Sequence, residues 1–303
     1  MQAQYSYQEE LAKSERINWR IEDIIGGDKR LDFSKPFLPE SLARVTGLTF
    51  LTPHEQMVVN QIRGHGYLAT FGVVEEFILP FVLDHARPQL SGDDHRVRAL
   101  LQFAAEEAKH IHLFKCFRED FAAGFGTPCG VIGPAEDIAR AVLAHHPLAV
   151  GIAILGIEWM TQGHYVESVK DDQALDPQFA SLLKHHWMEE AQHAKLDTLM
   201  VEALVDSCSA EEVSRAVDEY FEIGLFIDDG LKQQVVFDID AFETATGRRL
   251  SDDERGTYTD VQHQAMRWTY LGSAMRNPNF LATLDRVGPG VRARVEDVAP
   301  AFC

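Results

Sequence analysis

Carboxylate and imidazole side chains recur in this sequence at a spacing that could hold metal ions. Residues 185–193 read HHWMEEAQH, and on a helix His186, Glu190 and His193 would share one face. An earlier stretch, EEAKH at residues 106–110, repeats the Glu-x-x-His core. In four-helix bundles, two Glu-x-x-His helices and one glutamate from each of two further helices form a di-iron or di-manganese site.

The two further glutamates can be placed by an internal repeat. Glu75 precedes Glu107 by 32 positions, and Glu158 precedes Glu190 by the same 32. Both midpoints fall in segments predicted as turns, so each half would be a helical hairpin with its two glutamates at equal height. The repeat predicts as metal ligands Glu75, Glu107, His110, Glu158, His186, Glu190 and His193.

Several nearby residues are alternatives to these ligands or could support them. Glu76 could replace Glu75, but it breaks the equal spacing. Glu106 and Glu189 could each reach a ligand histidine on the neighbouring hairpin and fix its orientation, or they could be surface charges. Three other polar residues are expected to be solvated or core polar groups: His112, His164 and Glu167. His185 points about 100° away from His186, so it is expected at the surface or beside a ligand. Some aromatic residues could line a substrate cavity or form ordinary core: Phe71, Phe103, Phe114, Trp159 and Trp187.

Charge balance favours a pair of divalent cations. Four buried carboxylates facing two such cations sum to zero, whereas unpaired buried carboxylates are strongly disfavoured. Oxygen-rich ligation with some imidazole suits iron or manganese better than a metal that selects thiolates. The predicted cofactor is therefore two iron ions, with manganese as the alternative.

Composition narrows the class of protein. The 303 residues carry a net charge of −19, which argues against nucleic acid or an anionic membrane surface as a partner. The four cysteines form no Cys-x-x-Cys pair, as is typical of free thiols in a reducing compartment. The first 20 residues are polar, and no apolar run is expected to span a membrane. We therefore expect a cytoplasmic protein.

Helical periodicity extends over almost the whole chain, so the predicted fold is an all-α four-helix bundle. We expect a single domain over residues 1–303. Residues 1–50 would form an N-terminal arm with one short helix, 51–206 the di-metal bundle, and 207–303 C-terminal helices that pack on the bundle. The long helices are expected from Thr52-Pro53 to Leu83 with a kink at Pro80, at about 93–123, from Pro147, and at about 178–206. A fifth begins at Ser209 and is expected to break near residues 228–230.

The seven-residue pattern resembles the p-aminobenzoate N-oxygenase family of ferritin-like di-iron oxygenases. Its distinguishing feature is a third histidine one turn before the last glutamate, a position that His186 occupies. Gly66-Tyr67 ahead of Glu75 also resembles that family's first helix, which places Tyr67 near the site. The resemblance covers roughly residues 55–205 and implies a three-histidine site, O₂ activation and a homodimer.

One departure concerns the substrate. The family's aminobenzoate enzyme holds the substrate carboxylate with an arginine on the first helix, close to the glutamate ligand. Here residues 67–71 read YLATF, and Arg63 lies at least two turns further away. Aminobenzoate is therefore not the expected substrate.

The predicted function is that of a non-haem di-iron oxygenase that uses O₂ and an electron donor to oxidise a small organic substrate. N-oxygenation of an amine is the specific expectation, and a short pocket with a polar end would favour it. The alternatives are a hydroxylase or desaturase-type oxidase of C–H bonds, which a long apolar tunnel would favour, and a non-catalytic or ferroxidase-type iron protein.

Overall fold

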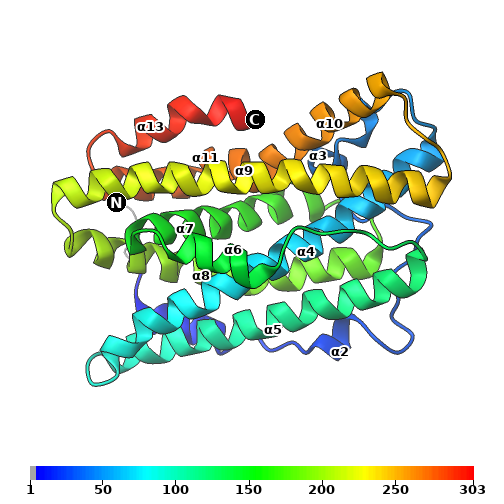
Figure 1. Cartoon of the computed structure of the whole chain (residues 1–303). Helices are drawn as coiled ribbons and strands as arrows, with labels where there is room; N and C mark the ends of the chain where they lie inside the picture. The colour runs from blue at the N-terminus through cyan, green and yellow to red at the C-terminus, as the bar shows by residue number, and fades with distance from the viewer. Residues whose placement is uncertain (1–4) are drawn as a thin grey trace.

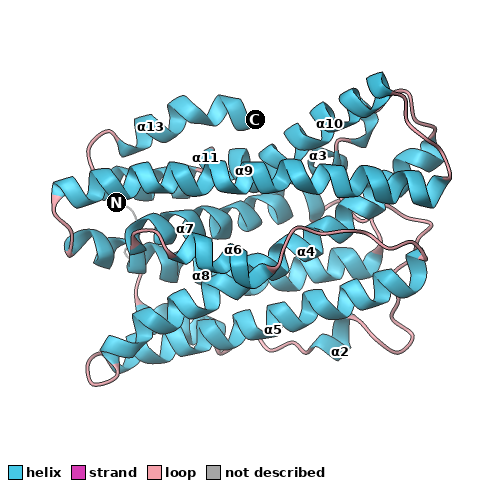
Figure 2. Ribbon diagram, viewed as in Figure 1, coloured by secondary structure: helices cyan, strands magenta, loops and turns pink. Residues whose placement is uncertain are grey.

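The computed structural model describes residues 5–303, and its regular secondary structure within this range is helical (Figure 2). Two helical hairpins form the central bundle: α4 (Pro53–Ala86) with α5 (Asp94–Phe125), and α7 (Pro147–His164) with α8 (Pro177–Asp206). Helix α5 also packs against α8, which joins the two hairpins (Figure 1). This arrangement confirms the predicted all-α, ferritin-like four-helix bundle.

Capping residues set where the bundle helices begin. The Thr52 hydroxyl and the Glu55 carboxylate form a reciprocal capping box at the start of α4, with Pro53 in the first turn. The Asp176 carboxylate caps α8 and Pro177 follows it. Because these signals fix the helix starts, they also fix the heights at which the glutamates and histidines face the core.

The N-terminal arm is more helical than predicted and wraps the bundle. It forms α1 (Tyr7–Ser14), α2 (Ile21–Ile24) and α3 (Glu40–Ala43), followed by the 3₁₀ turn η1 (Val45–Gly47). Helix α1 packs on α5 and α8, whereas α3 packs on α10 at the other side of the molecule (Figure 1). The expectation of one short helix was wrong because four-residue helices leave no periodic pattern in a sequence.

Helix α9 (Ala210–Thr246) runs along the bundle and covers α4 and α7. It passes through residues 228–230 without the predicted break. Asp228 is held there by tertiary partners: its carboxylate accepts hydrogen bonds from Arg267 at 2.6 and 2.7 Å and lies 2.8 Å from His263 Nε2. Contacts with a distant helix therefore override the local helix-breaking signal.

The C-terminal helices pack on different parts of the molecule (Figure 1). Helix α10 (Asp252–Arg267) continues through the π-helical turn η4 (Trp268–Gly272) into α11 (Ser273–Met275). Helix α12 (Pro278–Val287), which the sequence did not predict, and α13 (Val291–Val298) follow. Helix α10 lies against α9, whereas α11 and α12 pack on α7, and α12 also on α8. Gly272 has no room for a β-carbon because the carbonyl of Phe302 lies against it, so the turn η5 (Ala299–Phe302) packs directly on η4.

Shorter elements complete the connections: η2 (Arg87–Gln89), α6 (Ala135–Leu143) and the π-helical turn η3 (Tyr165–Val169). Pro80 lies inside the continuous helix α4. The segment Pro53–Gln89 is long and apolar enough to cross a membrane by length and composition, contrary to the sequence expectation. However, 67% of its most apolar window is buried inside the protein, as is usual for the core helix of a bundle.

Candidate metal centre

The structure brings the seven predicted ligand residues into the middle of the bundle. They come from α4, α5, α7 and α8, and each residue is at most 2% exposed. They are Glu75, Glu107, His110, Glu158, His186, Glu190 and His193. Equal height within each hairpin follows from the constant 1.5 Å rise per helical residue on both sides of the turn.

Their donor atoms form two overlapping groups. The first group is Glu75, His110, His186 and Glu190, and the second is Glu107, His110, Glu190 and His193. Within each group the candidate donor atoms lie within 4.8 Å of one another. Because His110 and Glu190 belong to both groups, the arrangement suits two neighbouring cations rather than one.

Carboxylates from the opposite hairpin hold two of the imidazoles. His110 Nε2 lies 2.9 Å from Glu189, and His193 Nε2 lies 2.8 Å from Glu106. Both carboxylates are buried, so they are not surface charges. Each Nε2–H can donate to its carboxylate, which leaves Nδ1 facing the centre, where both Nδ1 atoms approach Glu190 at 3.0–3.2 Å.

The two remaining predicted ligands are His186 and Glu158. His186 Nε2 lies 2.6 Å from Glu190 and 3.2 Å from Glu75, so its nitrogen also faces the cluster. Glu158 does not belong to either four-residue group. Its carboxyl nevertheless lies beside that of Glu190, and burial followed by repulsion from this neighbour raises the pKa of Glu158 well above its usual value.

Several buried polar atoms at the centre form no well-aligned hydrogen bond among residues 5–303, although most of them lie within 3.4 Å of an imidazole nitrogen or carboxylate oxygen of the cluster. They are Glu75 Oε2, both carboxylate oxygens of Glu107, His110 Nδ1, Glu158 Oε2 and Glu190 Oε1. Unsatisfied buried polar atoms are rare and unfavourable, yet here they converge on one region. Oxygen and nitrogen donors in this number fit a pair of iron or manganese ions.

The pKa values of the predicted ligands are those expected of a site that binds cations. Burial and then repulsion by Glu107 raise the pKa of Glu75 well above its usual value. Burial would lower the pKa of both His110 and His193, but the surrounding carboxylates raise it well above 6.5. The pKa of Glu107 falls to about 2 despite burial, because the Glu75 carboxyl hydrogen-bonds to its charged form and the His193 imidazolium attracts it. Protons therefore supply part of the positive charge that metal ions would bring.

The N-terminal arm contributes residues that sequence reasoning missed. Ser14 of α1 donates a hydrogen bond to Glu106. The Trp19 ring stacks on His110 with ring centroids 6.2 Å apart, and Lys109 Nζ lies 3.7 Å from the centroid of the Trp19 ring. Lys109 also pairs with the carboxylate that holds His110. Only its position next to His110 could have drawn attention to Lys109, and no spacing marks Ser14 or Trp19.

The alternative ligands lie elsewhere. Glu76, His112 and Glu167 are exposed. His185 bonds through Nδ1 to the Ser181 carbonyl at 2.7 Å, and His164 lies 3.0 Å from the Ser273 hydroxyl. These positions agree with the expectation for His112, His164 and Glu167. His185 is half-buried, and its ring lies 5.6 Å from that of Trp19.

Tyr67 is buried near the predicted metal ligands, beside Phe71, whose ring also meets that of His186. Its ring lies 4.4 Å from that of Phe71 and 6.1 Å from that of Tyr270. Burial, followed by the nearby Tyr270 and Glu190, raises its pKa well above 10. The Tyr67 phenol therefore stays protonated beside the acidic cluster.

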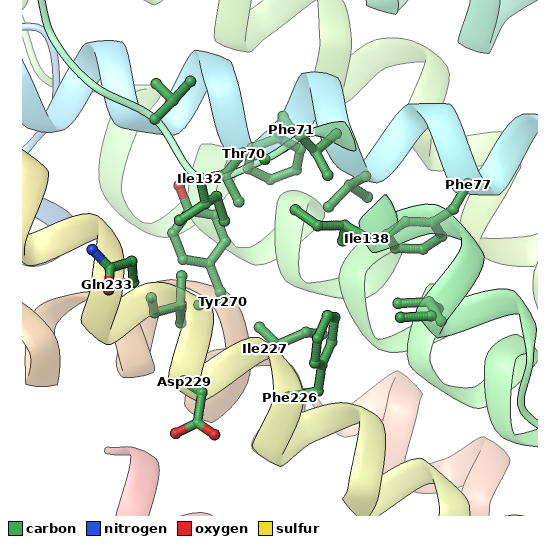
Figure 3. A pocket seen from close by; sticks show the side chains of 18 of the residues that line it. Thr70, Phe71, Phe77, Ile132, Ile138, Phe226, Ile227, Asp229, Gln233 and Tyr270 are labelled. Carbon is green, nitrogen blue, oxygen red and sulfur yellow. The ribbon is translucent and has the colours of Figure 1, made fainter. Parts of the chain in front are cut away.

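An apolar cavity of about 580 Å³ adjoins the cluster, between α4, α6, α7, α9 and η4 (Figure 3). Phe71 belongs to both regions, because it lines the cavity and its ring lies edge-on to His186 at 5.6 Å. Of the other aromatic residues considered, Phe114 lines a neighbouring hollow and Phe103 stacks on His193. Trp187 instead stacks on Tyr165, and the Trp159 carbonyl accepts a hydrogen bond from Asn277.

Comparisons with known proteins add evidence on the fold. No protein-family model and no curated protein sequence matches this chain. A solved R2-like ligand-binding oxidase variant with a Mn/Fe cofactor superposes with a TM-score of 0.52 at 15% identity, covering 95% of each chain. Another variant of that oxidase, with an Fe/Fe cofactor, gives a TM-score of 0.50 at 16% identity, covering 87% of this chain and 92% of that one. At this identity the likeness supports the ferritin-like fold.

Proposed function

We propose that this protein is a dimetal oxygenase that binds two iron ions, or one manganese and one iron, and oxidises a small organic substrate with O₂. The observation that carries the proposal is the convergence of buried carboxylate and imidazole donor atoms beside an apolar cavity. The ferritin-like neighbours whose cofactors are Fe/Fe or Mn/Fe support the choice of metals. The ligands would be the seven residues predicted from the sequence.

Bound metals would supply the binding and reduction of O₂. The protein's own residues prepare the site for this. Glu106 and Glu189 orient His193 and His110 and keep their Nε2 protons in place. Phe71, Phe103 and Phe114 exclude water from the centre, because their rings pack on His186 and His193. A dry environment protects reactive species from side reactions.

N-oxygenation of an amine is the specific reaction that we propose. One atom of O₂ would join the amine nitrogen to give a hydroxylamine, and the other would leave as water. Two electrons from a donor and two protons balance this step. The arylamine-oxygenase position of His186 and the compact cavity with hydroxyl groups at one end support this reaction.

C–H oxidation is the second candidate, favoured by the predominantly apolar lining of the cavity. A matched pair of substrates separates the two reactions. Methoxyaniline offers an amine where methoxytoluene offers a methyl group on the same ring. The protein loaded with Fe(II), given O₂ and a chemical reductant, should convert the aniline to its hydroxylamine or nitroso product, as measured by mass spectrometry.

The other outcomes are equally clear. Benzylic alcohol from methoxytoluene alone would establish C–H oxidation instead. Oxidation of iron without either product, with iron accumulating beyond two ions per chain, would establish a ferroxidase-type protein. Failure of the folded protein to retain two metal ions would overturn the dimetal proposal itself.

A further inference from the structure

The cavity beside the metal centre has one polar end formed by two hydroxyl groups. Thr70 of α4 and Tyr270 of η4 both line it, and they lie next to each other beside Phe71 (Figure 3). Both residues are nearly buried, at 8% and 7% exposure. Most of the other lining side chains are aliphatic or aromatic.

The two hydroxyls are not fully used by the protein. Thr198 and Thr283, also in helices, donate to the carbonyl oxygen one turn earlier, at 2.8 and 3.1 Å. Thr70 makes no such bond in the part of the chain that the structure describes, and its hydroxyl faces Tyr270 instead. Two hydroxyls offer two O–H donors, and one bond between them uses one. The other donor is available to a ligand.

Tyr270 reaches this place because of an irregular backbone. It occupies the middle of the π-helical turn η4, which re-aims side chains relative to a regular α-helix. Its ring lies 5.9 Å from that of Phe71, which in turn meets His186. A ligand group bound to Tyr270 would therefore be separated from the metal centre by about the width of one aromatic ring.

The charges of the residues that line the cavity disfavour anionic ligands. Among residues 5–303, no lysine, arginine or histidine lines it. The charged lining residues in this range are Asp137 and Asp229, and both are exposed at the rim. Burial raises the pKa of Tyr270 to about 12, so its hydroxyl remains a proton donor at neutral pH.

We propose that the Thr70–Tyr270 hydroxyl pair is the polar anchor of the substrate cavity and selects uncharged, largely apolar molecules that carry one hydrogen-bond acceptor. The identification of this ligand as a substrate rests on the proposed oxygenase function. Tyr270 is thus a positioning residue, which holds the substrate through its hydrogen-bond acceptor.

A pair of fluorescent probes tests the anchor without any catalytic assay. Prodan is an uncharged naphthalene with a dimethylamino group and a propionyl carbonyl, and dimethylaminonaphthalene lacks the carbonyl. Titration of the purified full chain should show that Tyr270→Phe weakens prodan binding about 2–10-fold, the usual worth of one neutral hydrogen bond. The emission of bound prodan should move to shorter wavelength because the carbonyl loses its donor. Binding of dimethylaminonaphthalene should not change.

Matched variants separate this role from a structural one. Tyr258→Phe also removes a buried tyrosine hydroxyl, but outside the cavity lining, and should leave both probes unaffected. Ile138→Trp should fill the cavity and weaken both probes. Unchanged prodan affinity and emission in Tyr270→Phe would overturn the proposal, as would probe binding that Ile138→Trp does not weaken. Since these readouts need no metal, they can succeed where the oxygenase proposal fails.

Discussion

Replacing Glu189 by glutamine tests whether the buried carboxylates beside the histidines tune metal binding. In the structure one oxygen of Glu189 lies 2.9 Å from His110 Nε2, and the other pairs with Lys109. Glutamine has the same shape but offers His110 only a neutral acceptor. We expect a less basic and less firmly oriented His110, and therefore weaker binding of both metals that this residue adjoins.

The size of the effect follows from the environment of the residue. Loss of such a carboxylate partner typically lowers metal affinity about 10–100-fold, or roughly 1.4–2.7 kcal/mol. Glu189 is only 1% exposed, so solvent does not screen the interaction. Anaerobic competition between the full chain and a chelator for Fe(II) or Mn(II) measures the affinity. Far-UV circular dichroism verifies that the variant is folded.

Glu76→Gln is the matched control, because it makes the same chemical change at an exposed position next to Glu75. Its metal affinity should stay within about twofold of wild type, as for most surface substitutions. Equal affinities of the Glu189 and Glu76 variants would refute the reasoning, since Glu189 would then serve only as a partner for Lys109.

Three further results are expected. Reconstitution with Fe(II) should give two metal ions per chain by elemental analysis. Glu75→Ala should lose at least one of these ions, whereas Glu76→Ala should keep both. The reverse result would show that Glu76, and not Glu75, is the ligand on α4. His186→Ala should keep the fold and much of the metal but lose most O₂ consumption coupled to substrate oxidation, and an unchanged rate would make His186 a core histidine. In the metal-free folded protein, the pKa values of His110 and His193 are raised above the ordinary histidine value. Their protonation therefore stabilises the folded state, fully below about pH 6.5, and this stabilisation is lost as the pH rises through the raised pKa values. Thermal scans should therefore show that the melting temperature of the metal-free protein falls as the pH rises above about 6.5. The melting temperature of the metal-loaded protein should not fall over the same pH range.

The repeated 32-residue spacing could be read from the sequence because its physical basis is local. Two helices joined by a turn rise equally on both sides, so residues equidistant from the turn lie at the same height. The spacing alone predicts that Glu75 lies opposite Glu107 and Glu158 opposite Glu190. All four are buried in the bundle.

Features that depend on distant contacts could not be read in this way. Trp19 meets His110 through an irregular arm, and Tyr270 reaches the cavity from a helix that begins far along the chain. Neither position has a periodic signal. Helix α9 continues past Asp228 because Arg267 neutralises that carboxylate, a pairing that no local pattern encodes.

Each hairpin supplies a carboxylate that holds a histidine of the other hairpin, and this determines the order in which the site can form during synthesis. During synthesis α4 and α5 emerge before α8, so His110 at first lacks Glu189, and His193 and Glu190 do not yet exist. A nascent chain that ends at the η3 turn offers only part of each four-residue group. We infer that metal capture waits until α8 has emerged and docked, so the unfinished chain has little opportunity to trap the wrong ion.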